Sequence, residues 1–119
     1  ARYRFEYPAM RYINENLLSE AKILFFFMGK RGYYCDREYI PDNANRFFNL
    51  VNQSETPQQI SEILLAQGAT HMLIQMVFFN KWVAEEFSPD EIKIIDVFFK
   101  NHVMALYSKN DVTLFALKE

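Results

Sequence analysis

The segment Lys22-Ile23-Leu24-Phe25-Phe26-Phe27-Met28-Gly29 decides how this sequence folds. Its apolar residues follow one another without polar alternation, which is typical of a strand that is buried on both faces. Such a strand needs a covering layer on each side of its sheet, and helices usually supply these layers. We therefore predict a central strand over residues 22–28, closed by Gly29.

The residues on either side of this strand predict one helix and one edge strand. Pro8 suits the first turn of a helix, and apolar residues follow it at spacings of three and four, which predicts a helix over residues 8–18. Beyond the central strand, residues 33–39 alternate in a way that favours a second strand at a sheet edge. Pro41 should end that strand.

Start and stop signals predict two helices next. Asp42 or Asn43 can cap a short helix over residues 44–52. Thr56-Pro57 is a capping residue followed by proline in the first turn, and Gly68 stands where a left-handed residue closes a helix. Helices placed between strands favour parallel pairing at the centre of the sheet.

The last third of the sequence predicts a strand, one or two helices and a hairpin. The strand covers residues 70–77, and Ser88-Pro89-Asp90-Glu91 starts a helix whose apolar stripe continues to Val103. A polar turn over residues 108–111 separates two apolar segments, 104–107 and 112–117, as in a β-hairpin. The fold expected is a three-layer α/β sandwich with a mixed sheet of about five strands and a C-terminal hairpin.

Size and composition limit the classes of function. The 119 residues suit one domain, which we place at 1–119, and half of them are hydrophobic, enough for a core without disulfides. A formal net charge of -2 argues against a nucleic-acid partner, because binding to phosphates needs an excess of cations. With a single cysteine, Cys35, no internal disulfide or cysteine-rich zinc site can form.

The apolar runs are too short for a membrane span of about 20 residues. The chain opens Ala1-Arg2-Tyr3-Arg4, without an initiator methionine or a signal peptide. We therefore expect a domain excised from a larger protein.

Gly29, Lys30, Arg31 and Gly32 form the candidate ligand-binding loop. Ligands of open α/β sheets favour the crevice beyond the carboxyl ends of the strands, where this loop should lie. Its glycines let backbone amides approach an anion or a lipid phosphate, and its two cations would neutralise the charge. The loop matches neither GxxxxGK[ST] nor GxGxxG, so a plain solvated turn is the alternative.

The other reactive side chains do not form a recognisable catalytic or metal-binding motif, and no cofactor is expected. Asp36 and Glu38 would share one face of the edge strand, where charges usually prevent aggregation. His71 begins a strand and His102 ends a helix, so both are interpreted as structural. Cys35 has no histidine near it in the sequence that would activate a nucleophile.

Seven short motifs are spread over most of the chain. They are Tyr7-Pro8-Ala9-Met10, Ile13-Asn14-Glu15-Asn16-Leu17, Ala21-Lys22-Ile23-Leu24-Phe25, Gly29-Lys30-Arg31-Gly32-Tyr33-Tyr34, Gly68-Ala69-Thr70-His71-Met72-Leu73-Ile74, Leu106-Tyr107-Ser108 and Val112-Thr113-Leu114-Phe115. Together they resemble the C-terminal soluble domain of multi-pass membrane glycosyltransferases of the dolichyl-phosphate-mannose protein mannosyltransferase type.

This resemblance implies a parent enzyme that transfers a sugar from a polyprenyl phosphate to an acceptor outside the cytoplasm. The family's catalytic acid lies in the membrane part, and no residue of this chain matches it. The chain would be an accessory domain on the extracytoplasmic (periplasmic) face. Its partners would be the membrane-embedded part of the same polypeptide and, in contact with it, the lipid-linked sugar or the acceptor. The alternatives are a free-standing α/β ligand-binding or regulatory module that uses the Gly29–Gly32 loop, and a small independent enzyme.

Overall fold

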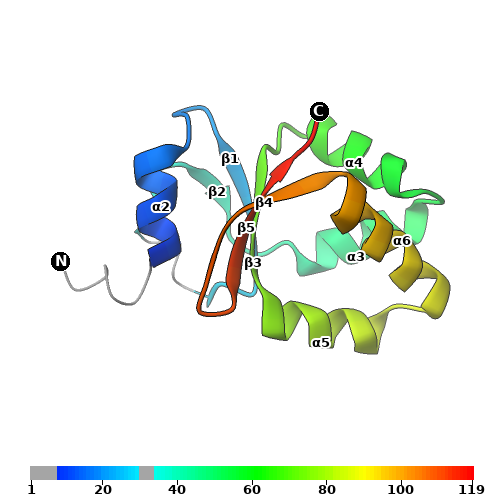
Figure 1. Cartoon of the computed structure of the whole chain (residues 1–119). Coiled ribbons are helices and arrows are strands. Elements are labelled where there is room, and N and C mark those ends of the chain that lie inside the picture. The colour runs from blue at the N-terminus through cyan, green and yellow to red at the C-terminus, as the bar shows by residue number, and fades with distance from the viewer. Residues whose placement is uncertain (1–7, 30–33) are drawn as a thin grey trace.

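The computed structural model describes residues 8–29 and 34–119. In these residues five strands form one sheet in the order β2-β1-β3-β5-β4 (Figure 1). Strand β1 pairs in parallel with β2 and with β3, whereas β5 pairs antiparallel with β3 and β4. The strands are β1 (Lys22–Phe26), β2 (Glu38–Ile40), β3 (His71–Gln75), β4 (Val103–Lys109) and β5 (Val112–Leu117).

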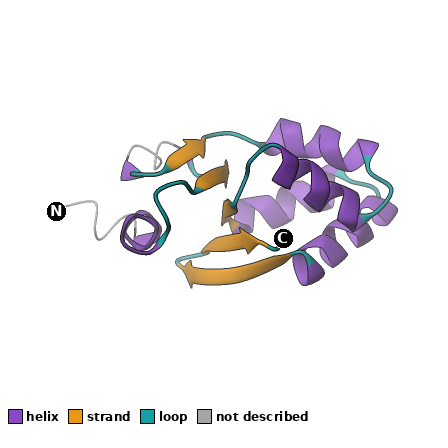
Figure 2. Cartoon of the chain, turned by 90° about the horizontal axis from the view of Figure 1, so that it is seen from above, coloured by secondary structure: helices purple, strands orange, loops and turns teal. Residues whose placement is uncertain are grey.

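Helices cover both faces of the sheet, so the predicted three-layer α/β sandwich with a mixed sheet is confirmed. Among the described residues, one helix packs against one face of the sheet and four pack against the other, and Figure 2 shows helices on both sides. The single helix is α2 (Pro8–Asn16). The four on the other face are α3 (Ala44–Gln53), α4 (Pro57–Ala66), α5 (Met76–Glu86) and α6 (Pro89–Asn101).

Strand β1 is buried on both faces, as its unbroken apolar run predicts. Ile23 and Phe25 pack in the core shared with α2, and Leu24 and Phe26 pack in the core shared with the four helices. The strand ends at Phe26, two residues earlier than predicted, because Phe27 turns into a left-handed backbone conformation at φ 61°.

The predicted helix starts are confirmed in detail. Thr56 and Gln59 form a reciprocal capping box at the start of α4, and Ser88 and Glu91 form another at the start of α6. Gly68 follows α4 with φ +85°, the left-handed residue expected there.

The hairpin is also confirmed. Asn110 and Asp111 both have positive φ, at 54° and 66°, which is the two-residue turn that fits the twist of paired strands.

Two strand boundaries differ from the predictions. The third strand ends at Gln75, and α5 begins at Met76, because the Gln75 side chain accepts a hydrogen bond from the Phe78 amide and caps the helix. The predicted second strand shortens to Glu38–Ile40, although it does lie at the sheet edge and does end before Pro41.

Two helix ends differ as well. Helix α2 stops at Asn16 rather than at residue 18, and the Arg37 guanidinium donates to the carbonyl oxygens of Asn14 and Leu17 at that end. Helix α6 stops at Asn101, so Val103, predicted in the helical stripe, instead begins β4.

Candidate functional site

A crevice of about 490 Å³ opens at the carboxyl ends of β1 and β2, where the sequence predicts the ligand loop. Of the four predicted ligand-binding residues, Gly29 lines this crevice, and Lys30, Arg31 and Gly32 lie outside the described residues. The lining residues are Phe27, Met28, Gly29, Pro41, Asp42, Ala44, Asn45 and Trp82.

The backbone of the crevice wall is turned sharply at the end of β1. Phe27 and Gly29 both adopt positive φ, at 61° and 60°. This conformation is unfavourable for phenylalanine, and the ring of Phe27 is held against the ring of Trp82 at a centroid distance of 5.6 Å. For Gly29 the same conformation carries no steric penalty. The aromatic contact therefore supports a strained turn beside the crevice.

Asn43 joins the two strands that border the crevice. Its side-chain Nδ2 donates to the Phe25 carbonyl at 2.9 Å and to the Ile40 carbonyl at 2.8 Å. The residue is 1% exposed, and its Oδ1 atom is buried without a hydrogen-bond partner. The sequence predicts Asp42 or Asn43 as the N-cap residue of this helix, and Asn43 is the residue at that position. Its side chain, however, makes no capping hydrogen bond.

The start of α3 decides which charge the crevice favours. Ala44 and Asn45 belong to the first turn of α3 and line the crevice, so the positive end of the helix dipole lies beside it. A negatively charged group is favoured there, although the Asp42 carboxylate on the same rim opposes it. Within residues 8–29 and 34–119, no group of three or more His, Cys, Asp or Glu side chains is placed to hold a metal ion.

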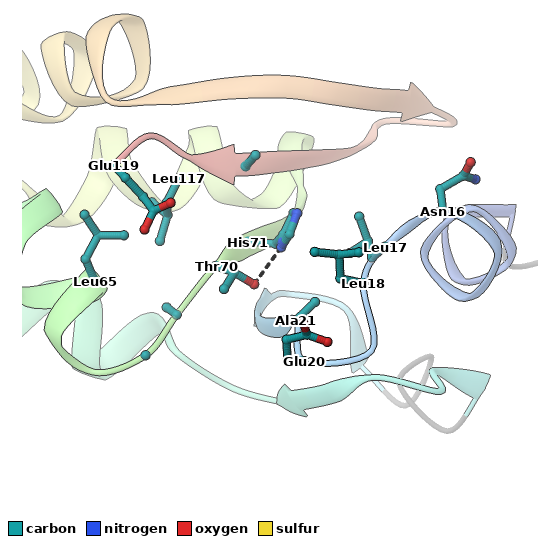
Figure 3. A pocket seen from close by; sticks show the side chains of 13 residues that line it. Asn16, Leu17, Leu18, Glu20, Ala21, Leu65, Thr70, His71, Leu117 and Glu119 are labelled. Atoms are coloured by element: carbon teal, nitrogen blue, oxygen red, sulfur yellow. Dashed lines mark hydrogen bonds between the residues drawn. The ribbon is translucent and has the colours of Figure 1, made fainter.

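A second pocket, of about 550 Å³, lies at the opposite end of the sheet, where β1 and β3 begin (Figure 3). It has an apolar floor and a polar rim that includes two carboxylates. Its residues come from three segments: the end of α2 with the loop after it, the end of α4 through the start of β3, and the end of β5 with the C-terminal residue. They are Asn16, Leu17, Leu18, Glu20, Ala21, Leu65, Gly68, Ala69, Thr70, His71, Ala116, Leu117 and Glu119.

Thr70 and His71 are the hydrogen-bonded pair of this second pocket. The Thr70 hydroxyl accepts from the Lys22 amide at 2.9 Å and lies 3.1 Å from the Lys22 carbonyl, so it links β3 to β1. The Nδ1 atom of His71 is 2.7 Å from the same hydroxyl (Figure 3). Burial lowers the pKa of His71, so the imidazole is mainly uncharged at neutral pH. From the sequence, His71 is interpreted as a structural residue, and nothing in the sequence indicates that it lines a pocket.

The remaining sequence candidates are dispersed. Burial raises the pKa of the half-buried Cys35 thiol, which disfavours the reactive thiolate. Asp36 lies in the loop before β2, so the prediction that it shares a strand face with Glu38 is wrong. Glu38 instead approaches Lys22, with Oε2 and Nζ 3.8 Å apart. His102 ends α6, as predicted, and stacks on the ring of Phe98.

Comparison with solved structures finds a likeness to the crystal structure of the C-terminal globular domain of an oligosaccharyltransferase from Archaeoglobus fulgidus. The likeness covers 93% of this chain and 95% of that one, with a TM-score of 0.56 and 17% sequence identity. No family model and no curated protein sequence matches the chain. At this identity the likeness concerns the fold, and the chain has the fold of that domain over nearly its whole length.

Proposed function

We propose that this chain is an accessory domain of a membrane glycosyltransferase that takes its sugar from a polyprenyl phosphate. The domain lies on the extracytoplasmic side and does not catalyse transfer by itself. The observation that supports this best is the fold shared with the C-terminal domain of an oligosaccharyltransferase over 93% of the chain. Mannose as the sugar rests on the sequence resemblance alone, since the structural neighbour is a different glycosyltransferase.

The distribution of reactive groups agrees with a non-catalytic role. Cys35, His71 and His102 occupy three different elements or loops of the chain. The larger pocket holds one of them, His71, with the carboxylates of Glu20 and Glu119 on its rim. His71 forms no hydrogen bond with either carboxylate, so the Thr70–His71 pair lacks the third group that would orient a catalytic base.

The test is a sugar-transfer assay with three samples. These are membranes that contain the full-length protein, membranes that contain it without residues 8–119, and the purified 119-residue chain. A radiolabelled polyprenyl-phosphate sugar is the donor. We expect transfer by the first sample, reduced transfer by the second and none by the third. Transfer by the isolated chain, or equal transfer by both membrane samples, would contradict the proposal.

The Gly29–Gly32 loop is proposed to receive the phosphate of the lipid-linked sugar. Gly29 and the first turn of α3 line one crevice, and Lys30 and Arg31 follow Gly29 in the sequence. We expect Lys30→Glu with Arg31→Glu to weaken transfer by the full-length enzyme without changing the thermal melt of the isolated domain. Lys118→Glu, an exposed charge reversal next to β5, is the control. Unchanged transfer by the double variant would contradict this proposal and would indicate that the loop is a plain solvated turn.

A further inference from the structure

The second pocket has an exposed leucine in its wall that packing within the domain does not explain. Leu18 is 74% exposed, the largest exposed fraction among the large apolar side chains of the described residues. It lines the pocket with Leu17, and Leu65 and Leu117 line it from α4 and β5 (Figure 3). The pocket volume of about 550 Å³ lies within the range of roughly 300–1,000 Å³ that is usual for ligand sites. An apolar group that enters this pocket would cover Leu18.

Backbone hydrogen bonds hold the three segments of this pocket in place. The Thr70 amide donates to the Lys22 carbonyl at 2.9 Å, and the Leu117 amide donates to the Thr70 carbonyl at 2.9 Å. The Ala21 amide donates to the Leu18 carbonyl at 3.1 Å, which closes the loop after α2. The pocket is therefore formed before a ligand arrives, and binding requires little ordering of the protein.

The polar side chains on the rim of the pocket offer acceptors of hydrogen bonds. The Asn16 side chain donates through Nδ2 to the Tyr12 carbonyl, which leaves its Oδ1 atom for a ligand. Glu20 and Glu119 add two exposed carboxylates. The Ser19 hydroxyl donates to Glu20 at 2.7 Å and lowers the pKa of Glu20, so this carboxylate is charged at neutral pH. A ligand that complements this rim donates hydrogen bonds and carries positive charge.

The cations near the pocket do not offset these two carboxylates. Arg37 donates to carbonyl oxygens at the end of α2, and Lys22 donates to a carbonyl oxygen just after α4, where the negative ends of the helix dipoles attract them. Lys118 does not line the pocket. Among the described residues, neither Glu20 nor Glu119 forms an ion pair. The rim therefore carries negative charge that a ligand can complement.

His71 places an uncharged ring in the pocket wall. Its Nδ1 atom contacts the Thr70 hydroxyl, and its Nε2 atom forms no hydrogen bond within residues 8–29 and 34–119. Because the imidazole is mainly uncharged at neutral pH, it does not repel a cation. Its Nε2 atom is left to form a hydrogen bond with a ligand, and a peptide backbone supplies both the donors and the acceptors for such a bond.

We propose that the second pocket binds a protein segment in which a lysine or an arginine stands next to an apolar residue. The apolar side chain of this segment covers Leu18. The aliphatic stem of the basic side chain lies on the pocket floor, and its cationic group lies at Glu20 and Glu119. The backbone of the segment forms a hydrogen bond with His71. The proposal does not rest on the proposed function, which uses the crevice at the opposite end of the sheet.

Titration of the isotope-labelled 119-residue chain with acetyl-Leu-Arg-Leu-amide, followed by nuclear magnetic resonance, tests this proposal. We expect the amide resonances of Leu18, Ala21 and Thr70 to shift and to reach saturation. Acetyl-Leu-Gln-Leu-amide has the same apolar residues without the positive charge, and it should bind about three- to tenfold more weakly. Acetyl-Leu-Glu-Leu-amide should bind more weakly still, because its carboxylate is repelled by the rim.

Two double variants with the same change in net charge test the rim. Glu20→Gln with Glu119→Gln should weaken binding of the arginine peptide about three- to tenfold and leave binding of the glutamine peptide unchanged. Glu85→Gln with Glu86→Gln is the matched control, since these exposed residues at the end of α5 do not line the pocket. It should leave both affinities unchanged. The terminal carboxylate is present in every sample, so its attraction cancels in the comparison.

The apolar wall is tested by Leu18→Ser, which should weaken binding of the arginine and glutamine peptides by the same factor. Thermal melts of all the variants should match that of the wild type, because every substituted side chain is exposed.

The proposal is overturned if the arginine peptide shifts no resonance of the pocket, or if the three peptides bind equally. It is also overturned if the Glu85 and Glu86 variant loses as much affinity as the Glu20 and Glu119 variant. Acetyl-arginine amide that binds as tightly as the arginine peptide would show that the pocket takes a small cation, which contradicts a protein segment as the partner. The transfer assay on the full-length protein decides the proposed function separately.

Discussion

At the scale of single residues, Asn43 connects two strands through the two hydrogens of one amide group. Its donors satisfy carbonyl oxygens at the ends of β1 and β2, in a place that water does not reach. Buried carbonyl groups left without a donor are costly, so this one side chain stabilises the rim of the crevice.

Replacing Asn43 with alanine should lower the free energy of unfolding by about 2 kcal/mol, because two hydrogen bonds are lost while one unpaired buried oxygen is removed. Asn45→Ala is the control, since Asn45 is exposed in the same helix turn and should change stability little. Urea unfolding followed by circular dichroism measures both. Equal stability of the two variants would contradict the role assigned to Asn43.

His71 should make stability depend on pH. Burial lowers the pKa of the folded-state imidazole below its ordinary value of about 6.5. The unfolded chain then binds a proton more readily, so the stability that the neutral ring contributes is present above about pH 6.5 and is lost as pH falls below it. We expect the wild type to lose more stability than His71→Gln between about pH 7 and pH 5.

Urea unfolding of both proteins at several pH values checks this prediction. Carboxylates titrate in both proteins, so their contribution cancels in the difference. A difference between the two proteins that stays constant with pH would contradict it. An imidazole proton resonance of His71 that titrates at or above pH 6.5 would do the same.

The sequence alone identifies residue types at these positions but not their partners. Asn43 is a good N-cap residue by type, and the sequence predicts a cap at Asp42 or Asn43. Its amide instead binds carbonyl groups that come from β1, 18 residues earlier, and from the end of β2. Contacts between distant segments are decided by the packing of the sheet, and no local pattern reports them.

At the scale of elements, local signals predict where helices begin better than where strands end. The start of α6 combines a serine cap, a proline in the first turn and a glutamate three residues after the cap, and the structure has all three in place. The boundary between β3 and α5 has no such signal. Apolar residues stand on both sides of Gln75, from Met72 to Ile74 and from Met76 to Phe79, so hydrophobicity does not mark where the strand ends.

Ser88→Ala should lower the free energy of unfolding by about 1 kcal/mol, because the Glu91 amide loses its acceptor at the start of α6. Ser19→Ala serves as the control: Ser19 is exposed and bonds only to its neighbour Glu20. Thermal and urea unfolding measure the two changes. A Ser88 variant as stable as the Ser19 variant would show that the capping box contributes nothing.

At the scale of the whole molecule, the two ends of the sheet differ in character. The carboxyl ends of β1 and β2 carry the crevice with Gly29, and helix α2 begins at this end of the sheet (Figure 1). The amino ends carry the larger pocket, with Glu20 and Glu119 on its rim. The layered α/β fold and the crevice position follow from the sequence, because β1 is apolar throughout and ligand crevices lie beyond parallel strands. The position of the second pocket does not follow from the sequence, since three segments that are distant in the sequence form it.

Under the proposed function, the domain lies beside the membrane part of its parent protein. Within the described residues, no helix is long and apolar enough to cross a bilayer. We propose that other parts of the parent polypeptide supply the attachment to the membrane; the solved structure that this fold resembles is itself the C-terminal domain of an oligosaccharyltransferase.

The most direct test of this account is alkaline carbonate extraction of membranes from cells that express the protein at its natural level, followed by immunoblotting with an antibody against this chain. The account predicts that the antibody detects a polypeptide much larger than the 14.2 kDa of these 119 residues, and that it stays in the membrane pellet. A band of about that small size, released into the supernatant, would contradict it.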